Sequence, residues 1–198
     1  CTGILLGIIS ATHQYSFLDR FATVFALLGV SMPVFWLGMM LIVFFSVKLS
    51  ILPSSGFSTP LHWIMPAVAV GYRASAIITR QTRSSMLEVI RQDYIRTARS
   101  KGITEREVIF HHSFRNALIP TVTIVGVQLG GLLGGAVLTE TVFAWPGLGR
   151  LVVQAVNGRD VPVVLGCIVV LSVGFSIVNL VVDLLYGFID PRVRSMYQ

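Results

Sequence analysis

The sequence predicts an all-α, polytopic membrane protein with about five transmembrane helices, the first of them partial, and a pair of helices on the cytoplasmic side. Of its 198 residues, 54% are hydrophobic and 12% are charged, whereas an ordinary soluble domain carries about 25% charged residues. Three runs, residues 21–47, 117–139 and 161–182, contain no charged residue. Each run is long enough to cross a hydrocarbon core of about 30 Å as a helix. This distribution excludes a soluble globular protein, and so much apolar surface also excludes a disordered chain.

The spans follow one another along a single predicted domain that covers residues 1–198. The first is expected to be the tail of a helix whose start is missing, because Cys1 opens directly into apolar residues, so we expect an N-terminally truncated chain. Pro33 is expected to kink the second span. The third span is the weakest, since it contains Pro66, Gly71 and Arg73. The expected spans are residues 1–11, 21–47, 61–79, 117–139 and 161–182.

The basic residues set the orientation of these spans. Eight of the 15 Lys and Arg residues lie between Arg80 and Arg115, and such clusters mark the cytoplasmic loops of membrane proteins. We therefore place the loop 80–116 and the C-terminus in the cytoplasm, and the segment 140–160 outside. The net charge of +6 could suggest nucleic acid, but this clustering argues against a nucleic-acid partner.

The loop 80–116 is predicted to begin with an amphipathic helix over residues 85–99. Apolar residues recur there at spacings of three and four, while the arginines lie largely off that stripe, which is the pattern of a helix with one apolar face. The stripe consists of Leu87, Ile90, Tyr94 and Ala98.

A glycine corner and a second short helix are predicted to follow. Gly102 lies where the first helix should end. Thr104 and Glu107 form a capping-box pattern, in which the Thr hydroxyl accepts from the Glu107 amide and the Glu carboxylate reaches back. The second helix should run over residues 105–116 and end before Pro120. A capped corner fixes the angle between two helices, which favours docking of a cytoplasmic partner over a pair that merely rests on lipid.

Glycines recur at four-residue spacing in the fourth span. Small residues on one face let two helix backbones approach closely. Two interpretations stay open: packing within this chain, and packing against a partner subunit along a moving pathway. The glycines are Gly126, Gly130 and Gly134 in one row and Gly131 and Gly135 in the other.

Catalytic and metal-binding motifs are missing from the sequence. The P-loop requires a lysine followed by Ser or Thr, but the two lysines, Lys48 and Lys101, are followed by Leu49 and Gly102. No HExxH motif and no paired carboxylates occur within the spans, and the four histidines lie outside the three uncharged runs. We therefore expect a chain that is not an enzyme and that binds no metal or cofactor itself. Arg73, well inside a span, either snorkels toward the inner interface or contacts a substrate, and both interpretations stay open.

Several stretches resemble a known family. The sequence YIRTARSKG at 94–102, continued by RNALIP at 115–120, is similar to the cytoplasmic signature of the permeases of ABC importers. Within that superfamily it resembles the dipeptide/oligopeptide/nickel branch. SMPVFWLG at 31–38, ETVFAWPGLG at 140–149 and DLLYGFIDPRVR at 183–194 agree with this resemblance, which covers nearly the whole chain. The general signature has an acidic residue and two alanines where this chain has Arg-Thr-Ala at 96–98, a departure that is usual for the peptide branch.

The resemblance implies a permease subunit that forms half of a translocation pathway for di- and oligopeptides and works by alternating access. Permeases for nickel chelates or for glutathione, from the same branch, remain alternatives. The implied partners are a second homologous permease, two P-loop ATPases that bind ATP and magnesium, an external solute-binding protein, and the lipid bilayer of a bacterial-type inner membrane. An ion-coupled secondary transporter is an alternative of another class, but it would need ionisable or unwound sites near the midplane, where only Arg73 and Pro33 come close.

The resemblance also implies roles for two groups of residues. The loop 80–116 would couple the spans to an ATPase, and the turn Trp145-Pro146-Gly147 would face the solute-binding protein as a candidate gate. The residues implied in ATPase coupling are Tyr94, Arg96, Thr97, Ala98, Arg99, Gly102, Thr104, Glu107, Arg115 and Asn116.

Overall fold

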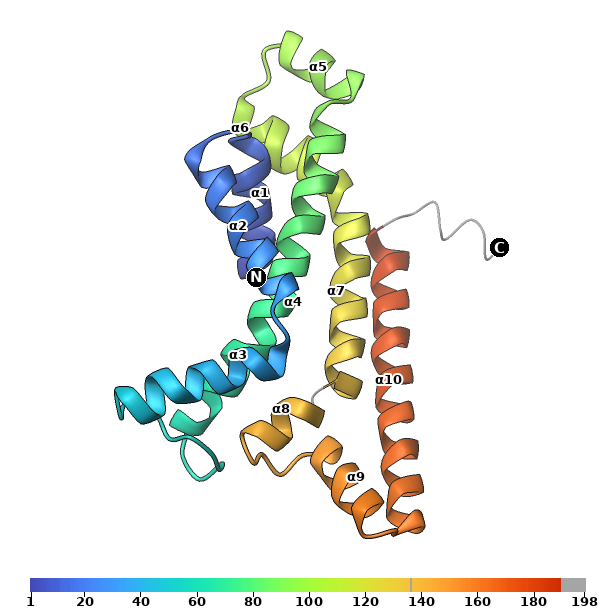
Figure 1. The fold of residues 1–198 in the computed structure, drawn as a ribbon. Helices are drawn as coiled ribbons and strands as arrows, with labels where there is room; N and C mark the ends of the chain where they lie inside the picture. Colours follow the sequence, from blue (N-terminus) through green and yellow to red (C-terminus); the bar gives the residue numbers. More distant parts are fainter. Residues whose placement is uncertain (136, 190–198) are drawn as a thin grey trace. The chain divides into compact units, whose positions relative to one another are not determined.

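The chain folds into helices, and no strand occurs in the part that the structure describes (Figure 1). The structure is a computed structural model that describes residues 1–135 and 137–189. A helix lies at each of the five predicted spans, so the all-α prediction is confirmed. The α-helices are α1 (Thr2–Thr12), α2 (Phe17–Ser31), α3 (Val34–Leu41), α4 (Leu61–Ile90), α5 (Asp93–Ser100), α6 (Glu105–Glu107), α7 (Arg115–Gly135), α8 (Val137–Val142), α9 (Leu148–Asn157) and α10 (Val161–Ile189), and the π-helices are η1 (Ile42–Lys48) and η2 (Val108–Phe114).

Two of these helices, α4 and the part of α10 over Val161–Val182, are long and apolar enough to cross a membrane. The pair of α2 with α3 and η1 is a third candidate, with a break between its two parts. Within the described residues, α7 is not among the helices that are long and apolar enough to cross a membrane, and α1 is apolar but shorter. These two therefore remain spans by the sequence prediction alone.

The second predicted span, 21–47, is not one kinked helix. The helix α2 ends at Ser31 and α3 begins at Val34, after Pro33 in an extended conformation with φ −62° and ψ 136°. Proline disfavours the helical conformation of the residue before it and lacks an amide donor. These two effects break the span rather than bend it.

Contacts between residues divide the chain into two compact units. Unit 1 consists of Cys1–Val30, Ala74–Val127 and the described residues from Val181 onward, and unit 2 consists of Ser31–Arg73 and Gln128–Leu180.

In unit 1, the hairpin of α1 and α2 lies beside α4 (Figure 1). The two helices α1 and α4 approach closely at Gly7, where a Cβ atom would overlap the Thr82 side chain. Four buried residues from α1, α4 and α7 form the core of this unit. They are Ile8, Ala11, Met86 and Ala117.

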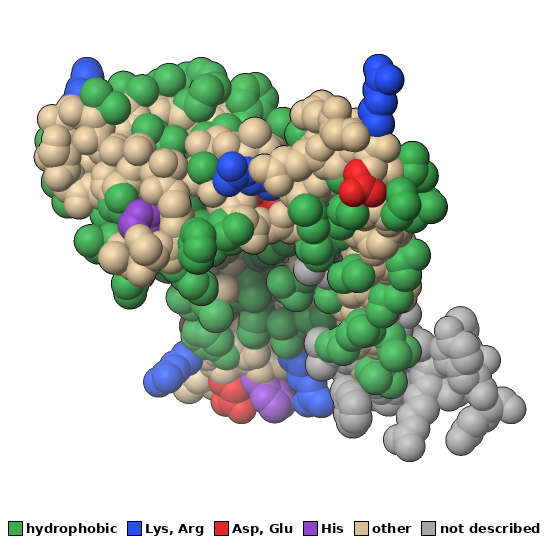
Figure 2. Space-filling view, turned by 90° about the horizontal axis from the view of Figure 1, so that it is seen from below, with side chains coloured by type: hydrophobic (Ala, Val, Ile, Leu, Met, Phe, Trp, Pro, Cys, Tyr) green, Lys and Arg blue, Asp and Glu red, His purple; other side chains and the backbone are tan. Residues whose placement is uncertain are grey.

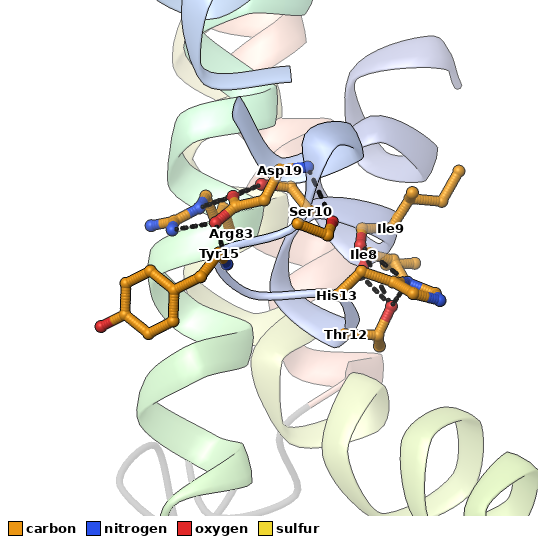
Figure 3. A network of polar contacts seen from close by, with 9 residues as sticks. Ile8, Ile9, Ser10, Thr12, His13, Tyr15, Asp19 and Arg83 are labelled. Atoms are coloured by element: carbon orange, nitrogen blue, oxygen red, sulfur yellow. Dashed lines mark hydrogen bonds and ion pairs between the residues drawn. The ribbon is translucent and has the colours of Figure 1, made fainter. Parts of the chain in front are cut away.

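A buried ion pair holds this hairpin to α4 (Figure 3). Arg83 Nε donates to Asp19 Oδ1 at 2.7 Å and Arg83 Nη2 donates to Asp19 Oδ2 at 3.0 Å. The Ser10 hydroxyl donates to Oδ1 at 2.5 Å, and the Tyr15 amide donates to Oδ2 at 2.9 Å. Asp19 is only 4% exposed, so its charge depends on these donors. The sequence offered no signal for this pair, because its partners are 64 residues apart.

In unit 2, the core forms around Phe143, which is 2% exposed and packs with Met65 and Ala69. Gly38 faces the Phe143 ring, where a Cβ atom would come within 3.0 Å of it. The amide of Gly56 donates to the Phe143 carbonyl at 3.1 Å, which anchors the loop between η1 and α4.

Figure 2 shows apolar side chains over much of one face, with few charged groups among them apart from those gathered at the lower edge of the view. On α10, for example, Leu165 and Val169 are 58% and 60% exposed. Soluble monomers rarely expose such continuous apolar areas. This surface suits contact with lipid or with partner subunits.

Candidate functional site

The helix α5 ends in a turn built around Gly102. Gly102 has φ +77°, a left-handed conformation that glycine adopts without strain. Its amide donates to Arg99 O at 3.0 Å, and the amide of Ile103 donates to Ala98 O at 3.4 Å. These two bonds form a Schellman motif, the common glycine-based end of a helix. The predicted glycine corner is confirmed.

The interior of the corner is a small apolar cluster. Ile95, Ala98 and Val108 are buried together, and Ile103 packs against them. Ala98 is therefore needed inside the corner, where a larger side chain would separate α5 from η2.

The first helix of the loop differs from the prediction. It does not run over residues 85–99: α4 continues to Ile90, and α5 begins at Asp93. Because of this break, the helical repeat of α4 does not continue into α5, and Leu87 and Ile90 belong to α4 alone. Ile95 is fully buried, whereas Tyr94, which the predicted stripe included, is 45% exposed.

The second helix begins as predicted and continues further. The Thr104 hydroxyl accepts from the Glu107 amide at 3.4 Å, so one half of the capping box is confirmed. The described residues do not form the reciprocal bond, in which the Thr104 amide would donate to the Glu107 carboxylate. The chain then passes through η2 directly into α7, and Pro120 lies inside α7 instead of after a helix end. Helices of membrane proteins tolerate such prolines.

An exposed ion pair closes the corner. Arg99 Nε and Nη2 donate to the two carboxylate oxygens of Glu105 at 3.0 and 2.7 Å. These hydrogen bonds from Arg99 lower the pKa of Glu105, and the same bonds raise the pKa of Arg99. The side chains are 41% and 58% exposed, so the pair contributes at most about 1 kcal/mol. Its geometry nevertheless fixes the end of α5 against the start of α6. Glu107 is among the predicted coupling residues, whereas Glu105 is not, because its partner is set by the turn at Gly102.

A second link joins α5 to α7. Asn116 Nδ2 donates to the Tyr94 hydroxyl at 2.8 Å and to the His112 carbonyl at 2.9 Å. One side chain thus ties α5, the π-helix and the first turn of α7 together. The structure therefore brings Tyr94 and Asn116, two residues of the predicted coupling set, into direct contact.

The remaining members of the predicted coupling set lie on the outside of the corner. Arg96 and Arg115 are exposed, and neither has an ion-pair partner in the described part of the chain. The Thr97 hydroxyl donates to Asp93 O at 3.0 Å, within α5. The corner thus combines a packed interior with exposed guanidinium groups on its outside.

The predicted external turn is also tightly organised. Trp145 packs edge-on against Trp63, with 5.2 Å between the ring centroids. The Glu140 carboxylate lies against Gly147, where a Cβ atom would overlap it. Glu140 also accepts from the Arg150 amide at 2.9 Å, in the first turn of α9. A carboxylate at the N-terminus of α9 caps the helix, and its negative charge interacts favourably with the positive end of the helix dipole. Neither Glu140 nor Trp63 is among the predicted site residues, although Glu140 belongs to the motif at 140–149.

The glycine rows of the fourth span have different surroundings. Within unit 1 a Cβ atom at Gly126 would overlap Val182, and within unit 2 a Cβ atom at Gly130 would lie 2.8 Å from the Phe175 ring. Nothing lies within 4 Å of such an atom at Gly131. The surroundings of the last two glycines, Gly134 and Gly135, fall outside the described part of the structure. Gly126 and Gly130 therefore serve packing within the chain.

Known proteins resemble this chain over almost its whole length. Residues 3–195 match the family model described as "Binding-protein-dependent transport system inner membrane component". The chain is 45% identical to the dipeptide transport system permease protein DppB of Escherichia coli K12, over 97% of this chain and 66% of the relative. It is 46% identical to the glutathione transport system permease protein GsiC of Pectobacterium atrosepticum, over 97% of this chain and 63% of the relative. The chain thus spans slightly less than two thirds of the length of these curated relatives.

The fold also has a counterpart among solved structures. A chain of the MetNI methionine ABC transporter, in an inward-facing conformation, matches with a TM-score of 0.76, over 95% of this chain and 86% of that chain. The two are 20% identical, so this likeness speaks for the fold alone. Together with the family match, these findings establish that the chain belongs to the inner membrane components of binding-protein-dependent transport systems.

Proposed function

We propose that the protein is the permease subunit of an ATP-driven importer and that it forms half of a translocation pathway for short peptides. The observation that carries this proposal is the rigid corner at 93–107, placed between two long helices in a chain that is 45% identical to a dipeptide permease. Glutathione is the second candidate substrate, because the glutathione permease is equally similar at 46% identity. Both candidates are short peptides, so the proposed substrate class is the same.

In this proposal the corner receives the movement of an ATPase subunit. Its packed interior and the Arg99–Glu105 pair keep α5 and α6 at a fixed angle, so that force on α5 moves the whole corner. The exposed guanidinium groups of Arg96 and Arg115 are suited to acidic groups on the ATPase surface. The path from α6 through η2 into α7 is continuously helical, which supplies a stiff connection to a span. ATP and magnesium belong to the partner chains.

The same proposal places the loop 80–116 and the C-terminus in the cytoplasm of a bacterial-type cell. The turn at Trp145 then lies outside and faces the solute-binding protein. A second, homologous permease completes the pathway, and closure of the ATPases switches the pair between inward- and outward-facing states.

The test uses the full-length permease expressed with its operon partners. Gly102→Val forces a β-branched residue into a left-handed conformation, and should abolish both uptake of a labelled dipeptide and co-purification of the ATPase. Gly166→Val is the matched control, since open space surrounds Gly166 and no role is assigned to it. Undiminished uptake in cells that lack the ATPase would overturn the proposal. Competition by unlabelled glutathione separates the two candidate substrates.

A further inference from the structure

A groove with one basic side runs along the last three turns of α4. Its walls are one face of α4 and the facing side of α2, both in unit 1, and it encloses about 710 Å³. That volume is within the range of sites that hold small organic ligands. The wall on α2 is formed by Ala22, Thr23, Ala26 and Leu27, and the wall on α4 by Thr79, Arg80, Arg83, Ser84, Leu87 and Glu88, with Arg91 directly after the helix.

The ion pair with Asp19 orients one guanidinium group of this groove in advance. Arg83 uses Nε and Nη2 to bind Asp19, which is nearly fully buried. Its third nitrogen, Nη1, has no hydrogen-bond partner within the described residues, and Arg83 lines the groove. A donor held in this way loses little conformational freedom when it binds an acceptor.

The rest of the charge in the groove is not balanced. Arg80 and Arg91 are exposed, and neither has an ion-pair partner in the described structure. Glu88 is the one acidic residue of the lining. Since Arg83 is neutralised by Asp19, the lining keeps one excess positive charge, which matches a singly charged phosphodiester.

The opposite wall is apolar and continues onto exposed apolar surface. Ala22, Ala26 and Leu27 line the groove, and their neighbours Val24 and Leu28 are 54% and 50% exposed. A free inorganic anion gains nothing from such a wall, whereas an acyl chain is stabilised by it. The groove also lies at the basic end of α4, a helix apolar enough to cross a membrane, where lipid headgroups are found.

We propose that this groove binds an anionic phospholipid of the phosphatidylglycerol type. The phosphodiester contacts Arg80, Arg83 and Arg91, and an acyl chain lies against Ala26 and Leu27. The inference does not depend on which solute the protein transports, and it assigns a lipid site to a surface that the coupling corner does not use.

The test measures lipid retention by the full-length permease in its complex. The complex is equilibrated with mixed micelles or vesicles of phosphatidylcholine that contain phosphatidylglycerol, and retained lipid is counted by native mass spectrometry. Arg80→Ala/Arg91→Ala should lower retention of phosphatidylglycerol by about 10- to 30-fold, since each basic residue near a lipid surface contributes about 1 kcal/mol. Lys48→Ala/Arg159→Ala is the matched control: it removes the same charge from exposed positions outside the groove, and should retain lipid as the wild type does.

Three further measurements keep the proposal open to refutation. The variant Arg80→Lys/Arg91→Lys keeps the charge of the groove and should retain most of the lipid. If the wild-type protein retains phosphatidylcholine and phosphatidylglycerol equally, the proposal is overturned. Displacement of the lipid by inorganic phosphate alone would identify a free-anion site and also overturn it. A photo-crosslinking residue at Thr23, which is half-buried in the groove, should become attached to lipid. Attachment to a protein chain instead would show that a partner occupies the groove.

Discussion

Arg83 and Asp19 form a bidentate ion pair in which the carboxylate is far more buried than the guanidinium group: the two side chains are 5% and 27% exposed. This asymmetry predicts unequal effects of removing either partner. Arg83→Met leaves a buried, unpaired carboxylate and should cost about 3 kcal/mol of unfolding free energy. Asp19→Asn should cost less, because Arg83 can still reach water. Denaturant unfolding in micelles measures both changes.

The double variant provides the control for this pair. Asp19→Asn/Arg83→Met has no charge left to bury, so it should be more stable than Arg83→Met alone. If the two single losses simply add, the carboxylate is not the source of the destabilisation.

The bond between Tyr94 and Asn116 predicts a measurable coupling between α5 and α7. Tyr94→Phe removes one neutral hydrogen bond and should cost about 1 kcal/mol, while Asn116→Ala also frees the His112 carbonyl and should cost more. In a double-mutant cycle the coupling energy should be about 0.5–1.5 kcal/mol. Asn116→Leu keeps a similar volume but can neither donate nor accept a hydrogen bond, so it should behave like Asn116→Ala. Loss of the bond should also make the amides of α5 exchange hydrogen faster. A coupling energy near zero would show that the Tyr94–Asn116 bond does not connect the two helices.

The glycines of α7 predict a position-dependent tolerance to larger residues. Gly126→Leu and Gly130→Leu should each destabilise the protein, by about 1–3 kcal/mol, because the new side chain overlaps Val182 or Phe175. Gly131→Leu should be tolerated, since open space surrounds that position. Thermal denaturation of the three purified variants compares them directly. Equal changes in stability at all three positions would contradict the packing interpretation, because helix propensity alone favours Leu over Gly at each of them.

The Glu140–Gly147 contact predicts non-additive substitutions in the external turn. Gly147→Ala should displace the Glu140 carboxylate and lose the cap on α9, which costs about 1 kcal/mol. Glu140→Ala loses the same cap without a clash. The double variant should therefore be no less stable than Gly147→Ala alone. A double variant that loses the sum of both effects would contradict this interpretation, and the near-ultraviolet circular dichroism of the Trp63–Trp145 pair provides a local readout.

The features of the corner that depend only on neighbouring residues could be predicted from the sequence. The glycine at 102 and the cap at Thr104 follow from rules that span a few positions, and the structure agrees with both. The apolar runs likewise indicated where helices lie, because hydrophobic composition is a property of the chain itself.

Other features depend on contacts between distant segments and left no local trace. The break at Arg91–Gln92 carries neither proline nor glycine, and it arises where α5 turns so that Ile95 can join the Val108 cluster. The same is true of Asp19, in the first turn of α2, which the fold buries beside Arg83. At Pro33 the sequence signal is present, but the result is a break between two helices and not the predicted kink.

The π-helix η2 joins the corner to α7. The number of residues in η2 sets the direction, around the axis of α7, in which the corner projects. In an α-helix each residue turns the chain by about 100° around the axis, and a π-helix accommodates an extra residue in a wider coil. Removing one residue of 109–114 would turn the corner around the axis of α7 by roughly a quarter of a circle, and would separate Tyr94 from Asn116. The direction in which this protein presents the corner therefore depends on a residue count as well as on the Tyr94–Asn116 bond and the apolar cluster of the corner.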